Sequence, residues 1–187
     1  MNFKLKFRQN CLKKRELSFK KKGNNCLKVN KIDEIISEIN SKLNILSIGI
    51  YYPIKTEISP LKLVEICKKL SIEICFPVMC AKKNELIFSK FEGEKNFIKK
   101  KYGIFEPVKL NKITPDIIFV PMVGFDKNLN RLGYGKGYYD RTISKLRKLK
   151  KIFVIGLAYD NQMVQNIPTE NHDEKMDIIL TDKKIYW

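Results

Sequence analysis

The sequence is short of several residue types, and each shortage excludes a class of protein. Histidine occurs once, at His172, and arginine only five times among 37 basic residues. None of the five cysteines forms a C-x-x-C pair, so neither a disulfide framework nor a zinc site is indicated. Nowhere do 18 apolar residues run together, and the N-terminal 22 residues lack the apolar centre of a signal peptide. We therefore expect a cytoplasmic protein that makes no use of a membrane.

The net charge of +17 raises the question of a nucleic-acid partner. Lysine, isoleucine and asparagine are abundant together along the whole chain, which indicates a compositional bias rather than a selected basic patch. Anionic small substrates explain the same charge equally well. We expect no nucleic-acid partner, although a basic RNA- or DNA-binding module stays as an alternative that a steep salt dependence of binding would reveal.

The apolar pattern indicates an open α/β fold. Apolar runs of strand length occur at 45–52, 72–79, 116–121, 152–159 and 176–181. Helices are predicted at 3–20, 32–43, 59–70 and 137–150. This alternation predicts a single domain, residues 1–187, with an open, mostly parallel sheet and helices on both faces, a Rossmann-like three-layer arrangement. In such sheets ligands bind beyond the carboxyl ends of the strands, so the loops after 52, 121 and 159 should share one edge.

Three details of this fold depend on local signals. Ser59 and Pro60 are typical of a helix N-cap and a first-turn proline, which would start the third helix there. Segment 85–91 is a candidate for an additional strand, and segment 99–107 is typical of a turn-rich connection.

Glycine is scarce, with nine in the chain, yet Gly133, Gly135 and Gly137 alternate within five residues. The segment lacks the P-loop pattern, and its first glycine lies too far from a strand for a dinucleotide fingerprint. A G-x-G-x-G segment running into a helix can turn backbone N–H groups toward an anion. The alternative is a merely mobile loop. Near the N-terminus, a stripe about 40° wide on the first helix carries three cations, Lys4, Arg8 and Arg15, with a solvated helix face as its alternative.

The longer string "VPMVGFDKNLNRLGYGKGYYDR" (120–141) closely resembles the signature of the 5-formyltetrahydrofolate cyclo-ligase family. The resemblance extends over nearly the whole chain. "YYPIKTEI" (51–58) resembles the family's substrate-binding strand end, "YGIFEP" (102–107) its central turn, and 155–182 its C-terminal segment. The spacing of the N-terminal stripe of cations also matches the family.

This resemblance implies an ATP-dependent ligase of one-carbon metabolism. Its reaction converts ATP and 5-formyltetrahydrofolate into 5,10-methenyltetrahydrofolate, ADP and phosphate, with Mg²⁺ required. Because a formamide oxygen is a poor leaving group, transfer of the γ-phosphoryl group onto that oxygen activates it, and the folate N10 then closes the ring. Such a transfer needs placement and charge neutralisation more than a protein nucleophile. The implied protein is a monomer whose folate substrate can carry a polyglutamate tail.

The family's functional residues carry over to matching positions of this sequence. The implied nucleotide-binding residues are Lys4, Arg8, Arg131, Leu132, Gly133, Tyr134, Gly135, Lys136, Gly137, Tyr138 and Tyr139. The implied substrate-binding residues are Tyr52, Glu57, Tyr134, Gly135, Lys136, Gly137 and Tyr138. Lys136 and Arg131 are the implied catalytic cations. Asp140 and Asp177 match the two aspartates associated with magnesium.

Two alternatives remain at this point. His172 invites a catalytic interpretation, but hydrogen bonds that order its loop are the favoured one. Related open α/β folds also serve phosphorylated-sugar isomerases and acyl-CoA transferases, since a fold does not fix a function. Glu57 and the pair of Lys4 and Arg8 would have no role in those enzymes.

Overall fold

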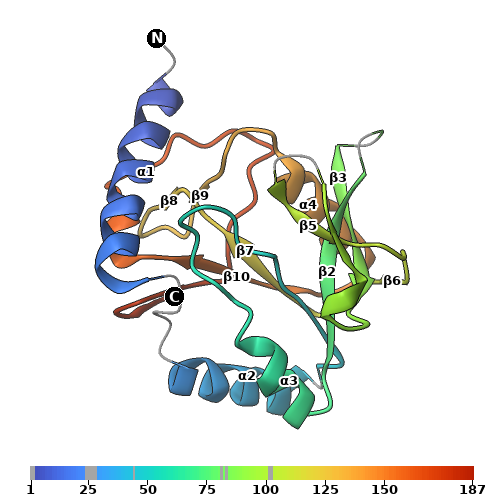
Figure 1. Cartoon of the computed structure of the whole chain (residues 1–187). Coiled ribbons are helices and arrows are strands. Elements are labelled where there is room, and N and C mark those ends of the chain that lie inside the picture. The colour runs from blue at the N-terminus through green and yellow to red at the C-terminus, as the bar shows by residue number, and fades with distance from the viewer. Residues whose placement is uncertain (1–2, 24–28, 44, 81, 83, 101–102) are drawn as a thin grey trace.

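A computed structural model of the chain describes residues 3–23, 29–43, 45–80, 82, 84–100 and 103–187. Its centre is an eight-stranded sheet in the order β12-β11-β10-β7-β1-β2-β3-β6 (Figure 1). The strands of this sheet are β1 (Ser47–Gly49), β2 (Glu73–Cys80), β3 (Glu85–Lys90), β6 (Lys112–Ile113), β7 (Ile117–Pro121), β10 (Phe153–Ala158), β11 (Ile178–Thr181) and β12 (Ile185–Tyr186). Two short hairpins lie beside it, formed by β4 (Phe97–Lys99) with β5 (Phe105–Pro107) and by β8 (Gly124–Phe125) with β9 (Arg131–Leu132). The helices are α1 (Phe3–Lys22), α2 (Val29–Leu43), α3 (Leu63–Lys69) and α4 (Tyr138–Leu149), with 3₁₀ turns η1 (Glu94–Asn96) and η3 (Asp160–Gln162).

The sheet is mostly parallel and covered on both faces, which confirms the predicted fold class. Strands β11, β10, β7, β1 and β2 pair in parallel, whereas β12, β3 and β6 join by antiparallel pairing. Alternate residues of β7 pack on opposite sides: Ile117 and Phe119 contact the core under α2 and α3, and Ile118 and Val120 contact the core under α4. A strand buried on both faces needs an unbroken apolar run, and this accounts for the sequence "IIFV".

The local predictions for the first half of the chain were partly wrong. The third helix begins at Leu63 rather than at Ser59. The residues before it form a turn, because the Ser59 hydroxyl accepts a hydrogen bond from the Leu61 N–H and the Pro60 carbonyl accepts one from the Leu63 N–H. The candidate strand at 85–91 is confirmed as β3. The connection at 99–107 contains strand β5, and its residues 101–102 lie outside the described part of the chain.

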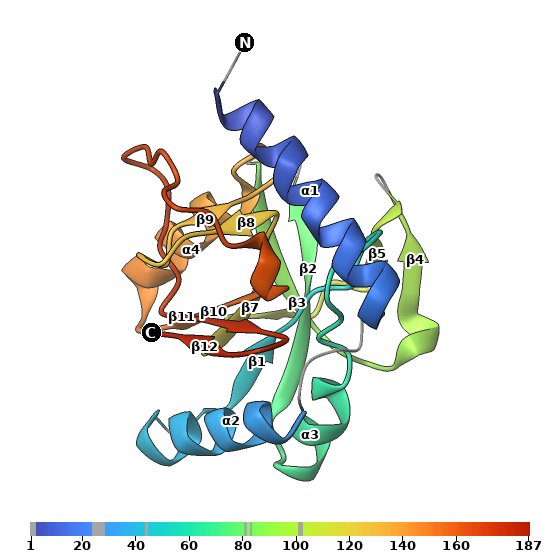
Figure 2. The same cartoon turned by 90° about the vertical axis from the view of Figure 1, so that its left-hand side faces the viewer.

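Helix α1 lies beside the β8–β9 hairpin and the η3 turn, as the view in Figure 2 shows. The approach is close at Gly124, where an added Cβ would lie 2.8 Å from the buried Cys11 Sγ. At the end of the helix, the Tyr159 hydroxyl donates a 2.7 Å hydrogen bond to the Gly23 carbonyl. These contacts fix α1 against the carboxyl ends of the sheet strands. Across the described residues, no helix combines the length and apolar character needed to cross a bilayer.

Candidate active site

A cavity of about 790 Å³ lies at the carboxyl edge of the parallel strands. Its wall combines the start of α1, the loop after β1, the glycine-rich segment between β9 and α4, and the segment that precedes β11. Apolar side chains of the sheet complete it: Pro77, Met79, Leu86 and Pro121. The loops after 52, 121 and 159 therefore meet at one edge, as predicted, and the third of them contributes residues from the segment 167–173 between β10 and β11. The volume lies in the usual range of small-molecule sites, about 300–1,000 Å³.

The alternating glycines pack closely against arginine side chains, and this leaves little room for a larger residue at these positions. An added Cβ would lie 2.8 Å from Arg131 Nη1 at Gly133, 3.0 Å from Arg8 Nη2 at Gly135 and 2.7 Å from Arg141 Nη1 at Gly137. Gly135 and Gly137 also have positive φ angles of +93° and +65°, which side chains rarely permit. Because Gly137 is the N-cap of α4, the segment leads into a helix N-terminus. The arrangement is a cation-backed turn with the geometry expected of an anion site.

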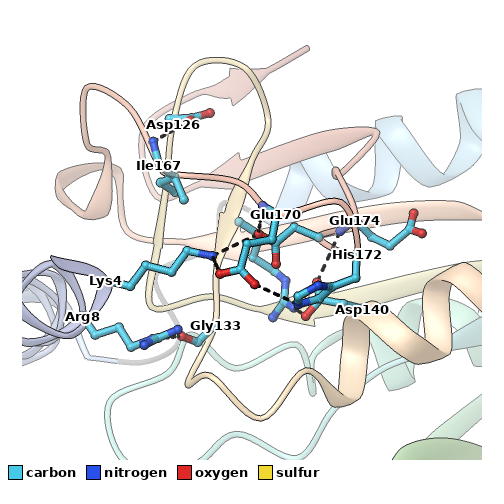
Figure 3. A network of polar contacts seen from close by, with 11 residues as sticks. Lys4, Arg8, Asp126, Gly133, Asp140, Ile167, Glu170, His172 and Glu174 are labelled. Atoms are coloured by element: carbon cyan, nitrogen blue, oxygen red, sulfur yellow. Dashed lines mark hydrogen bonds and ion pairs between the residues drawn. The ribbon is translucent and has the colours of Figure 1, made fainter. Parts of the chain in front are cut away.

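The cations of α1 face this turn. Lys4 Nζ donates hydrogen bonds to Glu170 Oε1 at 2.7 Å and Asp173 Oδ2 at 3.2 Å, and Arg8 Nε donates to the Gly133 carbonyl at 2.9 Å (Figure 3). Burial lowers the pKa of Lys4, but the two carboxylates outweigh it and raise the pKa above its ordinary value. Lys4 and Arg8 both line the cavity, so the predicted stripe of cations faces the site rather than solvent alone.

Asp140 occupies the first turn of α4 and lines the same cavity. Arg131 Nη2 donates to both of its carboxylate oxygens at 2.7 Å, and the Glu174 N–H donates to Oδ1 at 3.5 Å. The Asp140 side chain is therefore held between the glycine-rich turn and the segment that carries Asp173 (Figure 3).

Asp177 lies elsewhere. It immediately precedes β11, at the amino end of the sheet, and its Oδ2 accepts from the Val154 N–H at 2.6 Å and from Arg147 Nη2 at 3.2 Å. It does not line the cavity. The prediction that Asp140 and Asp177 share one ion does not fit this arrangement.

The carboxylates of the cavity nevertheless suit a magnesium ion that is bound mainly by the ligand's own oxygens. Among the described residues, no three His, Cys, Asp or Glu side chains are arranged so that they could hold a metal ion by themselves. Three carboxylates line the cavity, on Asp140, Glu170 and Asp173, and each is paired with a cation of the cavity wall. Mg²⁺ is commonly bound by one or two carboxylates together with water and phosphate oxygens. These residues therefore fit an ion that arrives with a polyphosphate better than a resident ion.

Glu57 provides a buried carboxylate on the other side of the site. Its side chain is almost fully buried, Oε2 accepts from the Ile54 N–H at 2.9 Å, and Oε1 lies 3.8 Å from Arg15 Nη1. Burial raises the pKa of Glu57 to about 7, although the Ile54 N–H, Arg15 and a hydrogen bond with Tyr134 act in the opposite direction. A buried carboxylate with unused acceptor capacity can bind paired N–H donors.

Aromatic rings complete the site beside Glu57. The Tyr52 ring centroid lies 4.7 Å from that of Phe105 and 6.0 Å from that of Phe97, in the β4–β5 hairpin. On the other side, Tyr138 packs under Arg141 and Tyr139 under Arg131, with cation-to-centroid distances of 5.8 and 5.7 Å. Planar ligands therefore have aromatic surfaces at both ends of the cavity.

The sequence analysis missed three acids that shape the cavity. Glu170 and Asp173 lie in the segment "TENHDEK" and had no predicted role, and His172 Nε2 lies 3.5 Å from Glu170 Oε2. Glu106, in the segment "YGIFEP", is buried at the opposite wall, where it accepts from the Met79 N–H at 3.2 Å.

Asp126 is a fourth missed acid, and it holds two walls of the site together. Its fully buried carboxylate accepts from the Asn128 and Asn130 N–H groups, from Asn130 Nδ2 and from the Ile167 N–H, at 2.9 to 3.1 Å. Ile167 lines the cavity, and Figure 3 shows this contact beside the Lys4 network. The turn-forming run "DKNLN" was the signal that could have identified this role.

Fold and site together define an open α/β protein with a glycine-rich turn suited to an anionic group and a buried carboxylate suited to N–H donors. The model of the 5-formyltetrahydrofolate cyclo-ligase family matches residues 1–182, and the chain belongs to this family.

Relatives and solved structures agree with this assignment. The chain is 37% identical to a 5-formyltetrahydrofolate cyclo-ligase of Haemophilus influenzae over 134 residues, which cover 68% of this chain and 71% of the relative. It is 30% identical to the enzyme of that name from Mycoplasma genitalium, with coverage of 90% and 91%. A solved 5,10-methenyltetrahydrofolate synthetase from Mycoplasma pneumoniae superposes with a TM-score of 0.73 at 28% identity, covering 97% of this chain and 100% of the other. The corresponding protein from Aquifex aeolicus gives a TM-score of 0.72 at 29% identity, with coverage of 99% and 92%.

Proposed function

We propose that this protein carries out the reaction of its family, the ATP-dependent cyclisation of 5-formyltetrahydrofolate to 5,10-methenyltetrahydrofolate with release of ADP and phosphate. The observation that carries the proposal is a cavity whose wall includes both the cation-backed glycine turn and the buried carboxylate of Glu57. The turn suits a polyphosphate, and the carboxylate suits the N–H donors of a pterin ring.

The chemistry requires both ligands at once. The γ-phosphoryl group leaves ADP and bonds to the formyl oxygen, which converts a poor leaving group into phosphate. N10 of the folate then attacks the formyl carbon and closes the ring, and loss of the N10 proton with cleavage of the carbon–oxygen bond releases phosphate. The protein supplies orientation and charge neutralisation rather than a nucleophile of its own.

The nucleotide end is assigned to α1 and the glycine-rich turn. Lys4, Arg8, Arg131 and Lys136 line the cavity and would neutralise the phosphates, with Arg131 and Lys136 nearest the transferred group. The backbone of the turn, with the intervening side chains, would bind the remaining phosphate oxygens: Leu132, Gly133, Tyr134, Gly135, Gly137, Tyr138 and Tyr139. Lys4 pairs with Glu170 and Asp173 in the free protein, so ATP would exchange one anionic partner of Lys4 for another.

The folate end is assigned to Glu57 and the aromatic rings. Glu57 would accept N–H donors of the pterin, and Tyr52 would pack against the ring system. Tyr134 of the turn contacts Arg15, which lies beside Glu57, so the proposal places the meeting point of the formyl group and the γ-phosphate at residues 134–138.

Mg²⁺ is part of the proposal, as an ion that neutralises charge on the phosphate oxygens of ATP. Asp140 is its proposed protein ligand, and Asp173, one residue from the Asp140 contact with Glu174, is the second candidate in place of Asp177. The single domain spanning 1–187, the monomeric state, the cytoplasmic location and the use of polyglutamylated folate stay predictions.

A spectrophotometric assay for the methenyl product tests the proposal. Product should form only when 5-formyltetrahydrofolate, ATP and Mg²⁺ are all present. Equal product without ATP would refute the phosphoryl-activation mechanism, and turnover of a sugar phosphate without ATP would instead favour the isomerase alternative.

A further inference from the structure

We propose that Arg15 is a positioning residue that couples the two substrate sites by joining Glu57 to the glycine-rich turn through the Tyr134 hydroxyl. This inference rests on the proposed function, because it takes Glu57 as the folate end and the turn as the nucleotide end. It adds a thermodynamic link between them.

Arg15 lies between parts of the chain that are distant in sequence. It is on α1, seven residues after Arg8, and its side chain is only 1% exposed. Nε donates to Thr56 Oγ1 at 3.0 Å, in the loop that carries Glu57, and Nη2 donates to the Tyr134 hydroxyl at 2.7 Å. One guanidinium group thus holds the folate loop and the nucleotide turn.

The hydroxyl of Tyr134 extends this connection. It accepts from Arg15 at 2.7 Å, and the Glu57 carboxylate lies near enough that, after burial, its charge is the next cause that raises the pKa of Tyr134. The Tyr134 ring lies under the guanidinium, with 5.6 Å between Arg15 Cζ and the ring centroid, and the residue remains 44% exposed to the cavity side. Because Tyr134 stands between Gly133 and Gly135, the hydrogen bond to its hydroxyl ties Arg15 to the backbone that would hold the phosphates.

The network is incomplete in the free protein. Nη1 of Arg15 is buried and has no hydrogen-bond acceptor among the described residues, and Glu57 Oε1, at 3.8 Å, lies just beyond hydrogen-bond distance. A buried guanidinium N–H without an acceptor is unfavourable, so a small shift that brings the two groups together is favoured. A pterin bound to Glu57 would reposition this carboxylate, and Arg15 would transmit the shift to Tyr134.

Coupling of this kind predicts that each substrate tightens the binding of the other, since linkage between two sites is reciprocal. We would titrate 5-formyltetrahydrofolate with and without a saturating non-hydrolysable ATP analogue plus Mg²⁺. The wild-type protein should bind folate at least about fivefold tighter with the nucleotide, which is the lower end of typical coupling. Tyr134→Phe keeps the ring and loses only the hydroxyl, and it should reduce this ratio to below about twofold.

Matched controls separate coupling from a structural effect. Tyr186→Phe removes a hydroxyl that donates to Asp160 outside the cavity, and it should keep the wild-type ratio. Arg15→Gln should lower the ratio as Tyr134→Phe does. Lys14→Gln changes the residue just before Arg15 on α1, whose side chain donates to the Met163 carbonyl, and it should keep the wild-type ratio. Combining Arg15→Gln with Tyr134→Phe should lower the ratio no further than either alone, because both act through one hydrogen bond.

A wild-type ratio near one, or a wild-type ratio retained by Tyr134→Phe, overturns the inference even if Arg15→Gln fails to fold. A protein that forms methenyl product but has no coupling contradicts this inference alone. A protein that forms no methenyl product contradicts the proposed function and the inference with it.

Discussion

Replacing Gly135 with Val tests the glycine-rich turn at its most constrained position. Gly135 has a φ of +93°, and a Cβ there would lie 3.0 Å from Arg8 Nη2 and 3.1 Å from Arg8 Cζ. A β-branched residue therefore meets two obstacles, an unfavourable backbone conformation and a cation that has to move away.

The structure allows the size of the effect to be worked out. An outlying φ costs on the order of 1–3 kcal/mol. A charge-assisted hydrogen bond, such as one from Arg8 to a phosphate, contributes about 1.5–3 kcal/mol. Because 1.36 kcal/mol corresponds to tenfold in rate, loss of the Arg8 contact predicts a fall in kcat/KM of at least about tenfold, while the strained φ lowers stability. The fold should remain intact, since Gly135 is exposed at the cavity.

Gly93→Val is the matched control. Gly93 has a similar φ of +103°, but nothing lies within 4 Å of an added Cβ, and the residue does not line the cavity. This variant should lose about 1–3 kcal/mol of stability and keep kcat/KM within about twofold of wild type. Methenyl formation followed by absorbance, with thermal unfolding of each variant, decides between them. A Gly135→Val enzyme as active as Gly93→Val would mean that the turn does not bind phosphate.

Three further predictions concern the charged residues. Replacing both Lys4 and Arg8 with Ala should weaken MgATP binding at least about tenfold and barely change folate binding. If calorimetry finds the MgATP affinity unchanged, these two cations do not bind the nucleotide. Asp140→Asn should lower turnover at least about a hundredfold, roughly 2.7 kcal/mol, with partial recovery at raised Mg²⁺. Asp177 lies outside the cavity, so Asp177→Asn should leave the Mg²⁺ dependence of turnover unchanged. Equal effects of the two variants would contradict the placement of the ion. Because the pKa of Glu57 is raised to about 7, its ionised fraction, and with it folate affinity, should rise about tenfold between pH 6 and pH 8. Glu57→Gln should weaken folate binding, remove this pH dependence and spare MgATP, and a loss of MgATP affinity instead would show that the two ends are assigned the wrong way round.

Much of the fold was predictable because its strands are strongly patterned. The run at 117–120 is apolar throughout, as expected of a central parallel strand. Short elements were not predictable, since β8 and β9 are two residues each and depend on the buried Asp126 that closes the turn between them. The helix start at Ser59 was wrong because a serine followed by proline forms a turn as readily as a helix N-cap.

The site was predictable where a local pattern marks it and not where tertiary contacts decide. Glycine spacing identified the turn, and helical spacing identified a stripe of cations on α1, of which Lys4 and Arg8 line the same cavity. The proposed metal ligand near the C-terminus could not be selected from sequence, because Asp173 and Asp177 are four residues apart in one segment. Only the start of β11 after Asp177 shows that Asp173 reaches the cavity and Asp177 does not.

The central claim is that phosphate held by the glycine-rich turn is transferred to the formyl oxygen of the folate in the same cavity. The most direct test uses 5-formyltetrahydrofolate labelled with ¹⁸O in the formyl group, with mass spectrometry of the released phosphate after a single turnover. The mechanism predicts that the label appears in inorganic phosphate, in an amount equal to the methenyl product. Unlabelled phosphate, with the label released into water, would contradict it.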